Sequence, residues 1–189
     1  PEKYLYSENK ESNTSLNVWS CFPAVYNFGM SALGYLTVFK QISTMEGIFA
    51  ERIFTDTEKT QIRPSCVDVM AFSFSFELDY LGILNILKTY EIPFIAKDRD
   101  ESYPLISAGG PVVSANPEPF AEFFDFITIG DSENNINKIY KILNDNKEKS
   151  KSEKLELLSK VEGVYIPSFK KDGYFVKKSS ACLDCCVST

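Results

Sequence analysis

Two short apolar runs that each end in a glycine turn constrain this chain most. Residues 104–108 lead into a Gly-Gly-Pro turn at 109–111, and residues 126–129 lead into Gly130. Such runs are typical of buried strands, and glycine at a strand end lets a ligand approach the backbone closely. In an open α/β sheet, ligands bind outside the carboxyl ends of the strands. Either turn alone would suit an ordinary loop, but together they predict one crevice with glycine on both sides.

Strand-like and helix-like segments alternate along most of the chain. The apolar runs predict strands at about residues 17–22, 48–54, 67–73, 104–108 and 126–129. Apolar stripes at helical spacing predict helices at about residues 28–42, 78–90, 117–124 and 133–146. Alternation of this kind predicts an α/β fold. We expect a doubly wound, mainly five-stranded parallel sheet, with only a single helical turn or a loop between the second and third strands.

The composition changes after residue 146, where a run of Lys, Ser and Glu begins. We therefore expect an α/β domain at residues 1–146, followed by a linker and short appendage at residues 147–189. Within this second part, residues 153–161 favour a short helix. Residues 163–167 and 173–177 favour two extended segments that could form a hairpin.

Charge and residue counts exclude several classes of function. The chain has 189 residues, a net charge of −6 and no histidine. An acidic chain without a basic patch is not expected to bind nucleic acid or an anionic membrane surface. No apolar run is long enough for a membrane span, and no signal peptide is visible, so a cytoplasmic location is expected. Without histidine, Ser-His-Asp and Cys-His catalysis are excluded.

The five cysteines do not predict a disulfide framework or a metal site. Cys21 and Cys66 occur singly and are expected to behave as small apolar side chains. Cys182, Cys185 and Cys186 cluster near the end of the chain, but a single C-x-x-C without a second pair is a weak signal. We interpret the cluster as incidental. We expect neither a metal ligand nor a catalytic residue in the chain.

The lining of the predicted crevice limits its ligand. No G-x-G-x-x-G follows the first strand and no G-x-x-x-x-G-K-[ST] occurs, so the usual nucleotide motifs are missing. The turns instead offer hydroxyls, backbone groups, small residues and carboxylates without a cation, which suits a large, neutral, amide-rich ligand better than a free phosphate. The predicted ligand-binding residues are Pro23, Tyr26, Gly29, Met30, Ser73, Ser75, Glu77, Gly109, Gly110, Pro111, Gly130, Asp131 and Glu133.

The acidic members of this set have two interpretations. Asp131 and Glu133 precede a predicted helix, so capping of that helix is an alternative to ligand contact. Glu77 ends a predicted central strand and is expected to face the crevice, because a carboxylate is almost never buried without a partner. At Gly110, a valine is expected to block the ligand with little loss of fold, unless the glycine serves only the turn.

Several short blocks also carry a family likeness through their order and spacing. They are residues 22–31 (FPAVYNFGMS), 33–34 (LG), 51–54 (ERIF), 71–77 (AFSFSFE), 106–111 (ISAGGP), 116–119 (NPEP), 129–133 (IGDSE) and 163–167 (GVYIP). Together they resemble the N-terminal cobalamin-binding-type domain of a group of bacterial radical SAM proteins. The resemblance covers most of residues 1–170.

This resemblance implies a flavodoxin-like sheet that holds a corrinoid, with the first strand between the second and third. It also implies a partner in cis: a downstream radical SAM barrel in which a C-x-x-x-C-x-x-C motif holds a four-iron cluster that acts on S-adenosylmethionine. Cys182, Cys185 and Cys186 depart from that spacing, and the chain is expected to stop before the barrel. Without histidine, a bound cobalamin would have no protein histidine ligand.

The function expected from the sequence is therefore a corrinoid-binding-type domain that is not catalytic alone, within a parent protein that is a radical SAM enzyme. One alternative is a ligand-free interaction module that keeps the fold and docks a radical SAM barrel. A second alternative is a flavin or nucleotide binder.

Overall fold

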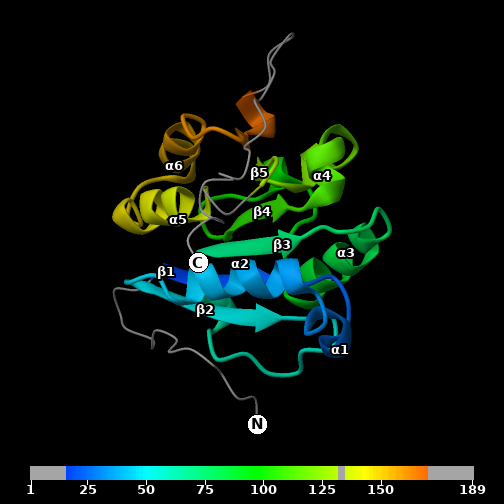
Figure 1. Ribbon diagram of the computed structural model, residues 1–189. Coiled ribbons are helices and arrows are strands. Elements are labelled where there is room, and N and C mark those ends of the chain that lie inside the picture. Colours follow the sequence, from blue (N-terminus) through cyan, green and yellow to red (C-terminus); the bar gives the residue numbers. More distant parts are fainter. Residues whose placement is uncertain (1–15, 132–134, 170–189) are drawn as a thin grey trace, which may run out of the picture.

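The computed structural model describes residues 16–131 and 135–169 of the chain (Figure 1). Its strands are β1 (Leu16–Cys21), β2 (Ile48–Ile53), β3 (Val69–Ser73), β4 (Leu105–Gly109), β5 (Phe126–Thr128) and β6 (Val164–Tyr165). Its α-helices are α1 (Tyr26–Gly29), α2 (Leu33–Ser43), α3 (Asp79–Thr89), α4 (Pro111–Ala115), α5 (Ile136–Asp145) and α6 (Lys151–Leu158). Short 3₁₀ helices are η1 (Pro64–Cys66), η2 (Ala96–Asp98), η3 (Glu118–Phe123) and η4 (Pro167–Phe169).

The strands form one sheet in the order β2-β1-β3-β4-β5-β6. The first five are parallel, and β1 lies between β2 and β3, so the flavodoxin-like order is confirmed. Each predicted parallel strand begins and ends within two residues of an observed one. Between β2 and β3 the chain forms only the three-residue η1, as expected for so short a crossover.

The five predicted parallel strands are confirmed, and the sheet has one additional strand, because β6 pairs antiparallel with β5. Residues 163–167 were expected to form a hairpin with residues 173–177. Val164 and Tyr165 pair with β5, where they satisfy backbone groups that would otherwise remain unpaired, and the hairpin stays a prediction. Residues 173–177 and the three C-terminal cysteines lie outside the described residues. The division at residue 147 stays a prediction.

One predicted helix is divided in the structure, and one observed helix was not predicted. The helix expected at residues 28–42 is split into α1 and α2. Gly29 ends α1. A Cβ at this position would collide with the Phe54 ring, so the backbone of Gly29 packs directly against that ring. The helix α4 was not predicted; it follows Gly110 with a proline at its first position, where the missing N–H is not needed.

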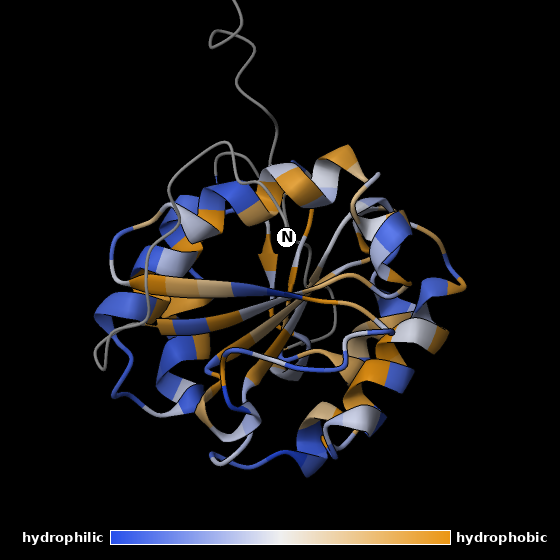
Figure 2. Ribbon diagram, turned by 90° about the horizontal axis from the view of Figure 1, so that it is seen from below, coloured by the Kyte–Doolittle hydropathy of each residue, from blue (hydrophilic) through white to orange (hydrophobic). Residues whose placement is uncertain are grey.

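Helices cover both faces of the sheet (Figure 2). The buried apolar side chains lie between these layers. On one face, Trp19, Met70, Phe72 and Ile106 form a core with α3 and η3. On the other face, large side chains such as Phe126 pack against α2, α5 and α6. The parallel strands are nearly continuous in hydrophobicity, as expected for strands covered on both sides.

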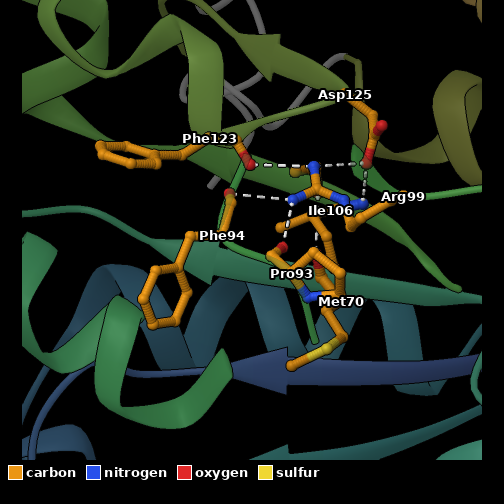
Figure 3. A network of polar contacts seen from close by, with 8 residues as sticks. Met70, Pro93, Phe94, Arg99, Ile106, Phe123 and Asp125 are labelled. Atoms are coloured by element: carbon orange, nitrogen blue, oxygen red, sulfur yellow. Dashed lines mark hydrogen bonds and ion pairs between the residues drawn. The ribbon is translucent and has the colours of Figure 1, made fainter. Parts of the chain in front are cut away.

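A buried ion pair joins three loops near the amino end of β5 (Figure 3). The Arg99 guanidinium donates to the Asp125 carboxylate at 3.0 Å and to the carbonyl oxygens of Pro93, Phe94 and Phe123, each at 3.0 Å. The same carboxylate accepts the backbone N–H of Ile106 in β4 at 2.7 Å. Burial lowers the pKa of Arg99, and the charge of Asp125 acts in the opposite direction. The pair therefore connects the segment before β5 to β4 and stabilises this part of the sheet.

None of the helices within residues 16–131 and 135–169 is long and apolar enough to cross a bilayer.

Candidate ligand-binding site

A cavity of about 600 Å³ lies over the carboxyl-terminal halves of β1, β3, β4 and β5, between the sheet and helices α2 and α5. We call it the carboxyl-edge cavity. The strands and the turns after them contribute Ser20, Ala71, Phe72, Ser73, Ser75, Ser107, Ala108, Gly109, Gly110, Phe126, Thr128, Gly130 and Asp131. The helices and the residue before α2 contribute Ala32, Leu33, Gly34, Tyr35, Thr37, Val38, Gln41, Pro111, Ser114, Ile136, Ile139 and Tyr140.

The cavity exists because side chains on this face of the sheet become smaller toward the strand ends. The strand register aligns Val18 with Val69 and Val69 with Leu105, which form a row of large apolar residues. The next row on the same face is Ser20, Ala71 and Ser107, and it ends at the large Phe126 on β5. The row after that is Ser73, Gly109 and Thr128. Small side chains in two successive rows cannot fill the space beneath the helices, and the hollow that remains is the cavity.

Helix α2 supplies one wall through residues at helical spacing. Gly34, Thr37, Val38 and Gln41 recur three or four positions apart, so they share a face. Helix α5 supplies the opposite wall with Ile136, Ile139 and Tyr140. Both helices belong to the core on this side of the sheet and contact each other. The cavity is therefore built on regular elements rather than on loops alone.

The lining is mainly apolar and almost uncharged, with hydroxyl groups distributed over it. It carries hydroxyls from five serines, two threonines and two tyrosines, and Asp131 is its only ionisable carboxylate among the described residues. Burial raises the pKa of Tyr140, so its phenol stays protonated and can donate a hydrogen bond at neutral pH. The Gln41 side-chain oxygen is buried without a hydrogen-bond partner in the described structure. Such an atom is costly unless a donor satisfies it, so a ligand with N–H or O–H groups fits this wall.

Seven of the predicted ligand-binding residues line this one cavity: Ser73, Ser75, Gly109, Gly110, Pro111, Gly130 and Asp131. The turn after β3 is held by Asp79, whose carboxylate accepts the N–H groups of Ser75 and Phe76 at 3.0 and 2.9 Å. Across the cavity, the Gly130 N–H donates to the Ser114 hydroxyl at 2.9 Å. The two glycine turns recognised in the sequence therefore do lie side by side.

The residues predicted after the first strand lie elsewhere. Pro23, Tyr26, Gly29 and Met30 are absent from the cavity lining. Tyr26 packs edge-on against the Phe54 ring, with centroids 5.3 Å apart, and its N–H donates to the Asp56 carboxylate.

The two remaining predicted residues were both acidic. Glu77 is exposed in the turn before α3 and does not line the cavity. Glu133 lies outside the described residues.

The glycines of the cavity fall into two kinds. Gly110 and Gly130 have φ of 125° and 91°, and a Cβ at Gly110 would lie 2.5 Å from the Phe74 carbonyl oxygen. A valine at Gly110 would therefore strain the fold, so it is not the harmless block expected from the sequence. Gly109 and Gly34 have room for a side chain. A Cβ at Gly109 would meet Thr128 at 3.7 Å, and one at Gly34 would meet nothing within 4 Å.

Sequence reasoning missed the walls of the cavity. Gln41 and Tyr140 were not proposed, although both lie on predicted helices and face the sheet. Ser20 and Ser107 were also missed. The alternation of side chains along the strands could have predicted the cavity, because Ser20, Ala71 and Ser107 occupy inward positions where large apolar residues are usual.

The cavity shows no metal-binding group. Within the described residues, no group of three or more Cys, Asp or Glu side chains could hold a metal ion. The expectation of no metal ligand remains a prediction for the rest of the chain.

Comparison of the chain with known proteins identifies its family. No curated protein and no solved structure matches the chain significantly. Residues 58–167 match the family described as Radical SAM proteins, N-terminal. The matched segment contains β3, β4, β5 and β6, and hence much of the sheet side of the cavity. Because the match spans more than half of the chain, the chain belongs to the family of N-terminal domains of radical SAM proteins.

Proposed function

We propose that this chain is a corrinoid-binding domain of a radical SAM protein and that the carboxyl-edge cavity holds part of the corrinoid. The observation that carries the proposal is the pair of small-residue rows beneath α2 and α5, which leaves a largely apolar hollow with hydroxyl groups and a single carboxylate at the ligand-binding edge of the sheet. The proposed binding domain is residues 1–146, with residues 147–189 leading toward the radical SAM core.

The residues present fit a corrinoid in chemistry and in size. A corrinoid is a neutral-rimmed macrocycle with many amide groups and an attached nucleotide. The unpartnered Gln41 oxygen would accept from an amide or hydroxyl, and the serine and threonine hydroxyls can donate or accept. A volume of about 600 Å³ lies in the usual range for small-molecule sites. It is smaller than a whole corrinoid, so the ring would extend beyond the cavity.

A bound corrinoid would supply a cobalt centre suited to methyl transfer. The chain's own contribution would be binding and orientation through Gln41, Ser107 and Gly109. The whole chain lacks histidine, so the cobalt would keep its own base or have no strong lower ligand. Iron–sulfur chemistry and S-adenosylmethionine cleavage would belong to the radical SAM core.

Apolar side chains around the carboxyl edge support docking of that core beside the ligand. Phe28, Leu33, Phe76 and Leu78 are each exposed by 69–78%. They come from α1, from the turn after β3 and from the start of α2, where Leu33 also lines the cavity. Exposed apolar groups that gather at one edge indicate an interaction surface. We propose that the radical SAM core in cis covers this edge and closes the cavity.

The same apolar edge keeps a ligand-free interaction module as the second candidate. Such a module would need the docking surface but not the hollow. Flavin mononucleotide or a free nucleotide is less well matched, since each carries a terminal phosphate dianion and the described lining has no cation for it.

Visible spectroscopy after reconstitution separates the three candidates. The purified full chain is incubated with hydroxocobalamin or, separately, with flavin mononucleotide, and unbound ligand is removed by gel filtration. We expect near-stoichiometric corrinoid absorption in the protein peak and no flavin. A protein peak without either chromophore would favour the interaction module, and a flavin spectrum would overturn the corrinoid proposal.

A further inference from the structure

A second cavity lies at the opposite edge of the sheet, beside the amino ends of β1, β3 and β4. We call it the amino-edge cavity. It has a volume of about 420 Å³. Asn17, Asp68 and Leu105 contribute from the strand starts, and Lys147, Lys151 and Lys154 contribute from α6 and the segment before it. The lysines belong to the run after residue 146 that the sequence predicts to be a linker, and none of these six residues contributes to the carboxyl-edge cavity.

The charges around this cavity are unbalanced toward positive, although the chain as a whole is acidic. Two acidic residues line it, and both have partners. The Asp68 carboxylate pairs with the Lys147 ammonium at 3.0 Å. The Glu101 carboxylate accepts the backbone N–H of Lys151 and so caps the start of α6. The basic residues in the lining are Arg63, Lys147, Lys151 and Lys154.

The Lys151 side chain is the unusual member of this group. Its ammonium nitrogen is buried and has no hydrogen-bond partner in the described structure. Burial lowers the pKa of Lys151, while the charges of Asp125 and Glu101 act against this without making a hydrogen bond. A buried ammonium without an acceptor is strongly unfavourable. An anion in the cavity would remove that penalty.

A second buried atom in the same lining needs the opposite kind of partner. The Asn17 amide nitrogen donates to the Cys66 carbonyl at 2.9 Å, but the Asn17 side-chain oxygen is buried without a donor. The cavity therefore presents an unsatisfied donor on Lys151 and an unsatisfied acceptor on Asn17. A ligand that satisfies both carries a negative oxygen and a hydroxyl group.

We propose that the amino-edge cavity is a binding site for a hydroxylated oxyanion of the sugar phosphate class, held chiefly by Lys151 with Lys154 and Arg63. The Lys151 ammonium would donate to the phosphate, and the Asn17 oxygen would accept from a hydroxyl. Ser65 and Ser102 add hydroxyls to the same lining. The site is separate from the proposed corrinoid site and does not depend on it.

Isothermal titration of the full chain with ribose 5-phosphate, inorganic phosphate and ribose tests this site. We expect ribose 5-phosphate to bind more tightly than inorganic phosphate, and ribose not to bind. Lys151→Met should weaken ribose 5-phosphate binding about 10- to 100-fold, as expected for loss of a hydrogen bond to a charged group. Because this substitution removes a buried unpaired charge, the variant should fold at least as well as the wild type.

Lys160→Met is the matched control. It removes the same charge near the same helix, but Lys160 is exposed, pairs with Glu156 at 3.9 Å and does not line the cavity. Lys154→Met gives a second variant in the lining. Failure of the wild type to bind either anion would overturn the proposal. So would equal weakening by Lys151→Met and Lys160→Met, which would indicate only a general charge effect, or a preference for inorganic phosphate over ribose 5-phosphate.

Discussion

Replacement of Arg99 by alanine should destabilise this domain more than any surface substitution. The Arg99 side chain is buried and donates four hydrogen bonds, one to the Asp125 carboxylate and three to backbone carbonyls. Alanine would leave that carboxylate buried without its counter-charge. Asp125 would keep only the Ile106 N–H. Because Asp125 precedes β5 and Ile106 lies in β4, loss of the ion pair would weaken the connection between these two strands.

The size of this effect follows from the burial of both partners. The side chains of Arg99 and Asp125 are 0% and 8% exposed, so solvent cannot compensate for the lost charge. Removal of one partner of a buried pair costs about 3–5 kcal/mol. For a domain of this length, 1 kcal/mol corresponds to about 2–4 °C in melting temperature. The expected decrease for Arg99→Ala is therefore roughly 6–20 °C.

Urea unfolding followed by circular dichroism, with thermal melting alongside, measures this decrease. The matched control is Lys160→Ala, which breaks the exposed pair with Glu156 and should change stability by no more than about 0.5 kcal/mol. A free energy of unfolding for Arg99→Ala within about 1 kcal/mol of the wild type would refute the stabilising role of the Arg99–Asp125 pair.

Three further substitutions follow from individual environments. Gly110→Ala should destabilise the domain by about 1–3 kcal/mol in urea unfolding, because of its φ of 125° and its approach to the Phe74 carbonyl; unchanged stability would contradict this. Gly34→Ala should stabilise α2 by about 0.5–1 kcal/mol, since its Cβ meets open space; a lower urea midpoint would contradict this. Tyr90 has its pKa raised to about 12 by burial, so its contribution to stability is complete below pH 10 and is lost as the pH rises toward 12. The free energy of unfolding of Tyr90→Phe should therefore decrease less than that of the wild type between pH 10 and about 12, and an equal decrease in both proteins would contradict this role of Tyr90.

Strands β3, β4 and β5 were predictable because each is a short apolar run with glycine or serine at or shortly after its carboxyl end. Leu105–Gly109 and Phe126–Thr128 were both recognised on this basis. Residues 163–167 were also predicted to be extended, and β6 lies within them, but the pairing of β6 with β5 was not predicted. Its pairing with β5 depends on an open sheet edge rather than on local sequence.

The candidate site was predictable on the sheet side and not on the helix side. Ser73, Gly109 and Gly130 could be placed because carboxyl strand ends share one edge. Pro23 and Met30 were misplaced because the sequence does not say over which face a loop folds. Gly82 of α3 packs directly against the Pro23 carbonyl, and Met30 joins the cluster around Phe22 and Phe54.

Gln41 escaped notice for a related reason. A polar residue on a helix with an apolar stripe is usually assigned to solvent. The small residues opposite it on the sheet are what turn this side of α2 into a cavity wall.

Corrinoid uptake by two Gly109 variants tests the central claim most directly. Gly109→Ala adds a Cβ that only touches Thr128, whereas Gly109→Leu would fill the hollow beneath α2 and α5. After confirmation that both variants fold, each is reconstituted with hydroxocobalamin beside the wild type, and bound corrinoid is measured from the visible spectrum. We expect the alanine variant to retain corrinoid like the wild type and the leucine variant to lose it. Equal retention by the leucine variant would show that the carboxyl-edge cavity is not the corrinoid site.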